Sequence, residues 1–160
     1  MTRFLHEYLG AATLGALLAA VHLLPGPITA RVVSGDWLIS FGFDRTAETL
    51  SMLNYLVDAA AFAVGIGGVL VFGYWLGRQI DLASAYRGML FRVGLGGVLG
   101  YVLVCFVVSV YDLVTTGGAG LLSLRTPVLL LFAGRAVGVA IQFPVVALAG
   151  GALATFTADR

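Results

Sequence analysis

The sequence predicts an all-α integral membrane protein, folded as an antiparallel bundle of four transmembrane helices. Its 160 residues are 60% hydrophobic and only 11% charged, with a mean hydropathy of +1.02, far from the composition of a soluble globular domain. Four apolar stretches each reach the roughly 20 residues that a membrane-spanning helix needs. These spans and their connections use the whole length, so we expect a single transmembrane domain over residues 1–160.

The first span covers about residues 4–24 and is expected to stop at the Pro25-Gly26-Pro27 sequence. Proline lacks a backbone donor and clashes with the preceding helical turn. Residues 25–48 then form the only long connection, an outer one. Its aromatic and aliphatic side chains between 37 and 43 are typical of an interfacial segment, in which rings lie at the level of the lipid headgroups.

The other spans are predicted at about 49–77, 89–115 and 127–155. Residues 78–88 form a short turn between the second and third spans. Pro127 suits the first turn of the last helix, whereas Pro144 is expected to kink it. Spans longer than about 20 residues imply helices that tilt or protrude from the hydrocarbon.

Arginine placement predicts the orientation. Five arginines lie at the termini, in the 78–88 turn or just after it, against three on the opposite face. Because cytoplasmic segments carry the excess of positive charge, we expect a multi-pass plasma-membrane protein with both termini in the cytoplasm. The apolar run over 4–24 resembles a signal peptide, but His22 inside it and Ile28 near the possible cleavage position favour a mature helix.

Small and polar residues recur at steps of three and four in every span, which places them on one helical face. Such faces pack against other helices, since small side chains let backbones approach closely. Three GxxxG pairs mark the predicted packing positions: Gly73 and Gly77, Gly96 and Gly100, and Gly134 and Gly138. We expect these pairs to pack helices within one subunit or in a homo-oligomer.

Two opposite charges inside the spans are the most specific signal. A rise of 1.5 Å per residue places Asp58 about 13 Å and Arg135 about 12 Å below the same outer face. Each charge alone would cost about 2.5 to 3.5 kcal/mol at the membrane centre. We therefore expect Asp58 and Arg135 to lie side by side as an ion pair.

Three further polar residues approach the same outer side, namely Asn54, Asp112 and His22. Two interpretations of this cluster remain open. The ion pair fixes which helices adjoin, or the cluster lines an outward-facing site for a solute or ion.

The sequence argues against several chemistries. The histidines, His6 and His22, both lie on the first span, which excludes bis-histidine haem ligation within one chain. The single Cys105 forms no CxxC pattern and no internal disulfide. We find no GxSxG, GxGxxG or Walker A sequence, so we expect no enzyme activity, no metal and no cofactor.

The predicted function is therefore that of a non-catalytic membrane subunit or interaction protein that packs through glycine-rich helix faces. Its expected partners are the lipid bilayer and either copies of itself or a larger membrane complex. A net charge of +1 without a basic cluster makes nucleic acid an unexpected partner. The alternative is a small transporter or channel with an outward-facing polar site around Asp58 and Arg135.

Overall fold

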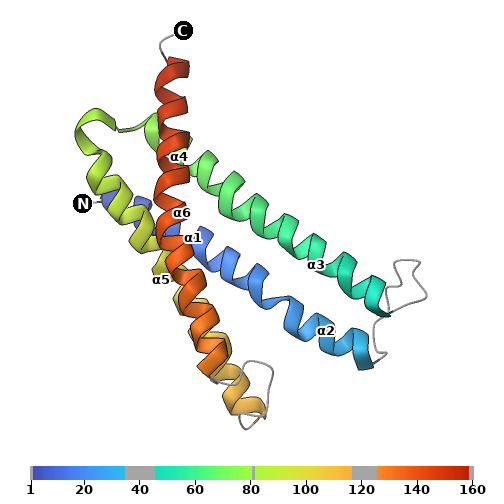
Figure 1. The fold of residues 1–160 in the computed structure, drawn as a ribbon. Coiled ribbons are helices and arrows are strands. Elements are labelled where there is room, and N and C mark those ends of the chain that lie inside the picture. The colour runs from blue at the N-terminus through green and yellow to red at the C-terminus, as the bar shows by residue number, and fades with distance from the viewer. Residues whose placement is uncertain (1, 35–45, 81, 117–125, 159–160) are drawn as a thin grey trace.

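The computed structural model describes residues 2–34, 46–80, 82–116 and 126–158, and every regular element in these ranges is helical (Figure 1). The elements are α1 (Thr2–Leu23), α2 (Pro25–Ser34), α3 (Thr46–Phe62), the π-helix η1 (Ala63–Gly68), α4 (Val69–Gly77), α5 (Leu82–Thr116) and α6 (Thr126–Ala158). Four stretches are long and apolar enough to cross a membrane: Leu5–Thr29, Ala47–Gly77, Ala85–Thr115 and Leu130–Thr157. The predicted all-helical class, with four helices of spanning length, is confirmed.

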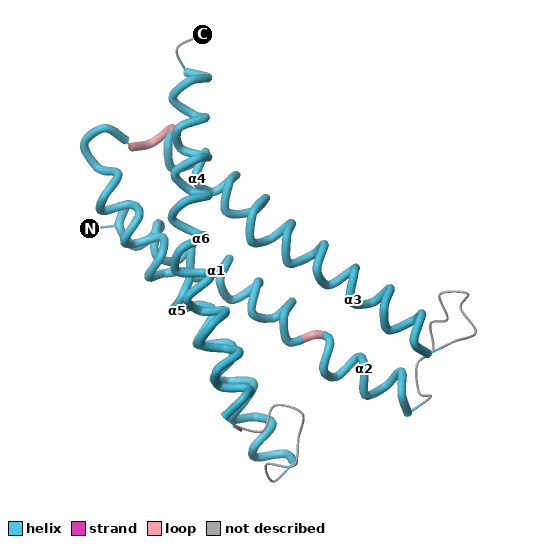
Figure 2. The backbone as a smooth tube through the Cα atoms, viewed as in Figure 1, coloured by secondary structure: helices cyan, strands magenta, loops and turns pink. Residues whose placement is uncertain are grey.

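The first helix ends at Leu23, directly before the prolines at which the sequence predicted it to stop, but helical structure resumes at once, so the first part of the predicted 25–48 connection is helical. The chain leaves the α-helix only at Leu24, whose N–H still bonds to the Ala20 carbonyl at 3.2 Å. A new helix, α2, begins directly at Pro25, and Figure 2 marks the short turn between α1 and α2. Proline is accepted there because the first residues of a helix need no intrahelical N–H donor. The aromatic part of the predicted connection, residues 37–43, lies outside the described residues.

The last two long helices extend beyond their predicted bounds. α5 begins at Leu82 rather than at 89, so the predicted 78–88 turn is mostly helical. α6 runs from Thr126 to Ala158 and continues through Pro144. Both helices are longer than the roughly 20 residues that crossing a bilayer requires, so they tilt or extend beyond the hydrocarbon.

The packing of α1 against α5 brings two backbones into close approach. A methyl group added at Gly100 would lie 2.8 Å from the Cα of Ala12, and one at Gly96 would lie 2.8 Å from the Tyr8 carbonyl oxygen. Only glycine leaves room for such a crossing. Gly15 on α1 approaches the Gly97 backbone in the same way.

The contact between α4 and α6 is built in the same manner. A methyl group at Gly73 would lie 2.6 Å from the Cα of Ala147, and one at Gly77 would lie 2.6 Å from the Cα of Gly151. α5 packs on α6 as well, so α5 and α6 connect α1 to α4. The largest fully buried side chains belong to these helices: Val69, Leu76, Met89, Val93, Tyr101 and Phe143.

The outer part of the second span departs from this packing. α3 lies alongside α1 and α2, and makes no substantial contact with α5 or α6 in the described part of the chain. Figure 1 shows α2 and α3 leading away from α5 and α6 toward one end of the molecule. The change occurs at η1, where the helix widens to i→i+5 hydrogen bonding in mid-span.

Candidate functional site

Three polar side chains from three helices meet inside the predicted membrane layer. The Nδ1 atom of His22, on α1, shares a hydrogen bond of 3.2 Å with the hydroxyl of Tyr101 on α5. Their rings meet edge to face, with centroids 5.9 Å apart. Arg135, on α6, lies near the same hydroxyl. Tyr101 therefore joins α5 to α1 through His22, with Arg135 nearby on α6.

Asp58 approaches this cluster from α3 without joining it by a direct bond. The charges of both Asp58 and Arg135 act on the His22 ring, which places the two predicted partners in one neighbourhood. Among the described residues, however, Asp58 and Arg135 do not reach ion-pair distance from each other. The Asp58 residue is exposed, whereas Arg135 is half-buried. The divergence of α3 from α6 accounts for this separation.

The other predicted members lie further out. Asn54 is exposed on α3, one turn from Asp58. Asp112 is half-buried on α5, two turns beyond Cys105, and its backbone carbonyl accepts a hydrogen bond from the Thr115 hydroxyl at 3.5 Å. The hydrogen bond between His22 and Tyr101 includes neither residue.

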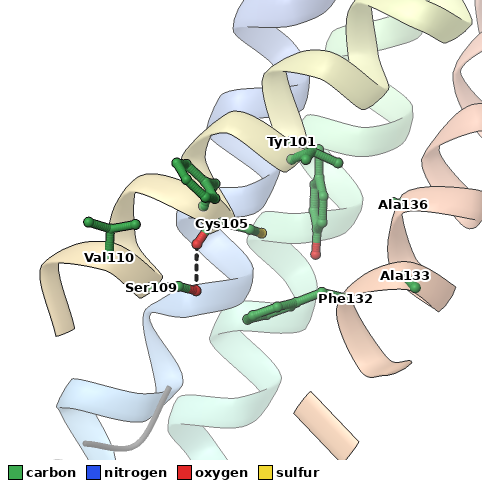
Figure 3. A pocket seen from close by; sticks show the side chains of 9 residues that line it. Tyr101, Cys105, Ser109, Val110, Phe132, Ala133 and Ala136 are labelled. Carbon is green, nitrogen blue, oxygen red and sulfur yellow. Dashed lines mark hydrogen bonds between the residues drawn. The ribbon is translucent and has the colours of Figure 1, made fainter. Parts of the chain in front are cut away.

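An apolar cavity of about 260 Å³ adjoins the cluster between α5 and α6. Figure 3 shows Tyr101 and Cys105 projecting from α5 into the same space, with Phe132, Ala133 and Ala136 on the α6 side. The Ser109 hydroxyl has its hydrogen-bond acceptor within α5, because it donates to the Cys105 carbonyl at 2.7 Å. The cavity wall is therefore apolar apart from its end at Tyr101.

A second polar contact lies near the π-helix. The Gln142 amide nitrogen, on α6, donates to the Gly65 carbonyl oxygen at 3.3 Å. Widening of a helix disturbs the regular pairing of its carbonyls, and a side-chain donor from a neighbouring helix can satisfy one of them. Gln142 thus ties the middle of the second span to the fourth.

The ion pair that the described residues do form was missed by the sequence analysis. Arg92 Nη1, on α5, donates to Glu7 Oε2, on α1, at 2.7 Å. The Glu7 side chain is only 4% exposed and that of Arg92 22%. The signal was available, since each residue lies three positions inside its predicted span, at the same depth from the same face.

The predicted glycine pairs differ in their surroundings. The pairs Gly73 with Gly77 and Gly96 with Gly100 lie against backbone of α6 and α1 respectively. Gly134 and Gly138 are exposed, and an added methyl group at either would meet no atom of the described residues within 4 Å outside the adjacent backbone of α6. The glycine face beside Arg135 is thus open in a single copy of the chain.

The described residues form no cluster of metal-ligating side chains. No group of three or more His, Cys, Asp or Glu side chains comes together within residues 2–34, 46–80, 82–116 and 126–158. Comparison with known proteins adds no assignment, since no family model, no curated protein and no solved structure matches this chain. Function must therefore be argued from the chain itself.

Proposed function

We propose that this chain is a non-catalytic subunit of a membrane assembly, which docks onto its partner through the outer half of its second span. It crosses the plasma membrane as an antiparallel bundle of four helices, with both termini in the cytoplasm. It holds no cofactor and catalyses no reaction.

The order of the interhelical contacts supports alternating crossings. Tyr8 lies opposite Gly96 and Ala12 opposite Gly100, so α1 and α5 run in the same direction. The contacts of Gly73 with Ala147 and of Gly77 with Gly151 give the same result for α4 and α6. A chain that crosses the bilayer four times requires the first and third spans to be parallel, and the second and fourth likewise.

The single observation that carries the docking role is the exposed acid on a poorly packed helix. Asp58 lies near the middle of a 31-residue span, on a helix that makes no substantial contact with α5 or α6 in the described residues. A carboxylate facing lipid at such depth costs about 2.5 to 3.5 kcal/mol. A partner protein packed on this face would shield the carboxylate from lipid and remove that cost. This is the physical reason to expect a partner there.

The proposal is tested by native mass measurement of the gently extracted protein, combined with photo-crosslinking. A photoreactive residue replacing Tyr55, which is 71% exposed on α3, is expected to trap a species of one defined mass. The same residue replacing Phe156, which is 74% exposed on α6, is the matched control and is expected to trap lipid alone. A monomeric mass together with no protein crosslink at Tyr55 would refute the docking role.

A second candidate is supported by the polar cluster. His22, Tyr101 and Arg135 gather donors inside the span, with Asp58 across from them, an arrangement that also suits an ion or small anionic solute. Under this alternative, flux into proteoliposomes is lost in Asp58→Asn and kept in Tyr55→Phe. Equal flux in both variants would exclude a transport role for Asp58.

A further inference from the structure

We propose that the partner is a second copy of this chain, and that Asp58 of each copy pairs with Arg135 of the other. The inference rests on the proposed docking role and names its partner. Asp58 and Arg135 form no ion pair in the described part of one copy, and in the dimer each would form one with the other copy.

Asp58 and Arg135 both lack a salt bridge among the described residues. Within the part of the chain that the structure describes, neither Asp58 nor Arg135 reaches ion-pair distance from an opposite charge. Arg135 has the Tyr101 hydroxyl as a neighbour, but a neutral hydroxyl does not balance its charge. Each residue therefore lacks a counter-ion in direct contact, and each is the counter-ion that the other lacks.

The two charges lie at similar depths along their helices. Asp58 lies twelve residues beyond Thr46, about 18 Å along α3, and Arg135 lies nine residues beyond Thr126, about 14 Å along α6. The difference is less than one helical turn. A two-fold axis along the membrane normal preserves depth, so the two charges meet twice across such an axis. A lipid phosphate lies at the surface of the bilayer, too far out to serve as the counter-ion.

Two helix faces carry these charges. One side of α3 is exposed along its length and carries Ser51, Asn54, Tyr55, Asp58 and Phe62 at helical spacing. On α6, Gly134 and Gly138 flank Arg135 and are open, which allows another helix to approach closely. One chain thus presents a polar helix face with an acid and a glycine-lined face with a base. This is the self-complementarity that a symmetric dimer requires.

The test is a charge exchange between copies. Two differently tagged copies are expressed together in the membrane, extracted gently, and purified through one tag while the other is measured. We expect wild-type copies to co-purify, and Asp58→Arg alone or Arg135→Asp alone to lower co-purification by about tenfold or more, because like charges then face each other twice. Asp58→Arg copies mixed with Arg135→Asp copies are expected to recover it, since the mixed pair contains one native and one reversed ion pair.

Two controls keep the result interpretable. Arg78→Asp, at the far end of the second span, should leave co-purification unchanged, because Arg78 is exposed outside the two faces. The double variant Asp58→Arg with Arg135→Asp in one chain should co-purify with itself, which shows that the reversed charges are compatible with folding.

Other outcomes overturn the inference. If the mixed single variants fail to associate while the double variant succeeds, the ion pair forms within one chain. If the wild type is a monomer in native mass measurement, the dimer does not exist. If it is isolated in fixed ratio with a different protein, the second copy is the wrong partner, although the proposed docking role stands.

Discussion

Replacing glycine by alanine in two GxxxG pairs should give opposite effects on stability, although the chemical change is identical. At Gly100 the added methyl group would overlap the Ala12 carbonyl of α1 and lie 2.8 Å from the Ala12 Cα. At Gly134 it would meet no atom of the described residues within 4 Å outside the adjacent backbone of α6. Both residues lie inside long helices, so they share the same change in helix propensity.

The magnitude follows from two opposing contributions. Alanine favours the helix over glycine by about 0.8 to 1.0 kcal/mol. Overpacking costs about 1 to 3 kcal/mol, and the upper end applies where the obstacle is backbone, because a main chain cannot rotate away as a side chain does. Gly100→Ala should therefore lower the free energy of unfolding by about 2 kcal/mol. Gly134→Ala should raise it by up to about 1 kcal/mol.

The assay is unfolding in mixed micelles of increasing sodium dodecyl sulfate, followed by far-ultraviolet circular dichroism. The protein concentration must be low enough for the chain to be monomeric, so that the Gly134 face stays free of a second copy. The propensity contribution cancels in the difference between the two variants, which isolates the close approach of α1 to α5. Equal effects of Gly100→Ala and Gly134→Ala, within about 0.5 kcal/mol, would refute the argument.

The same unfolding assay tests two other contacts. Arg92→Met should cost about 3 to 5 kcal/mol, because it leaves the buried Glu7 carboxylate without this counter-ion. Glu7→Gln should cost less, because Arg92 is partly exposed, and the double variant should cost less than the sum of the two. Arg87→Met, at an exposed arginine of the same helix, is the control, and strict additivity would show that the pair does not couple. Tyr101→Phe should cost about 1 kcal/mol, since it removes the hydroxyl that hydrogen-bonds to the His22 imidazole. Tyr111→Phe, at a side chain that is 69% exposed, should change little, and an equal loss in both tyrosine variants would contradict the hydrogen-bonding role.

Hydropathy and length were sufficient to predict four helices of spanning length, because both follow from the thickness of the bilayer rather than from packing. Helix ends were harder to predict. Pro25 was expected to end a helix, and α1 does end at Leu23, but Pro25 also begins α2, because the sequence alone does not show whether a new helix starts at a proline that follows a helix end. The π-helix was not predicted, because a shift in hydrogen bonding within an apolar helix leaves no periodic signal.

For the site, the sequence supplied depth but not the angles between helices. Counting residues from the span ends brought Asp58 and Arg135 to one level, and the charges of both do act on His22. Counting residues does not reveal that α3 diverges from α6. This divergence keeps Asp58 and Arg135 apart, so the expected direct contact is absent among the described residues. The same counting would have found Glu7 and Arg92, whose helices do pack tightly.

The π-helix in mid-span has a consequence for how the second span can be altered. α4 is held to α6 by its glycines, whereas η1 stands between this anchored half and the half that carries Asp58. A π-helix pairs i→i+5 and so holds one residue more than the α-helical segment that would replace it. Deleting one residue within η1 would therefore restore α-helical pairing and leave Asp58 facing nearly the same way. The same deletion in α3, between Asp58 and η1, would turn the acid by about 100° about the helix axis, because each residue of an α-helix contributes that rotation.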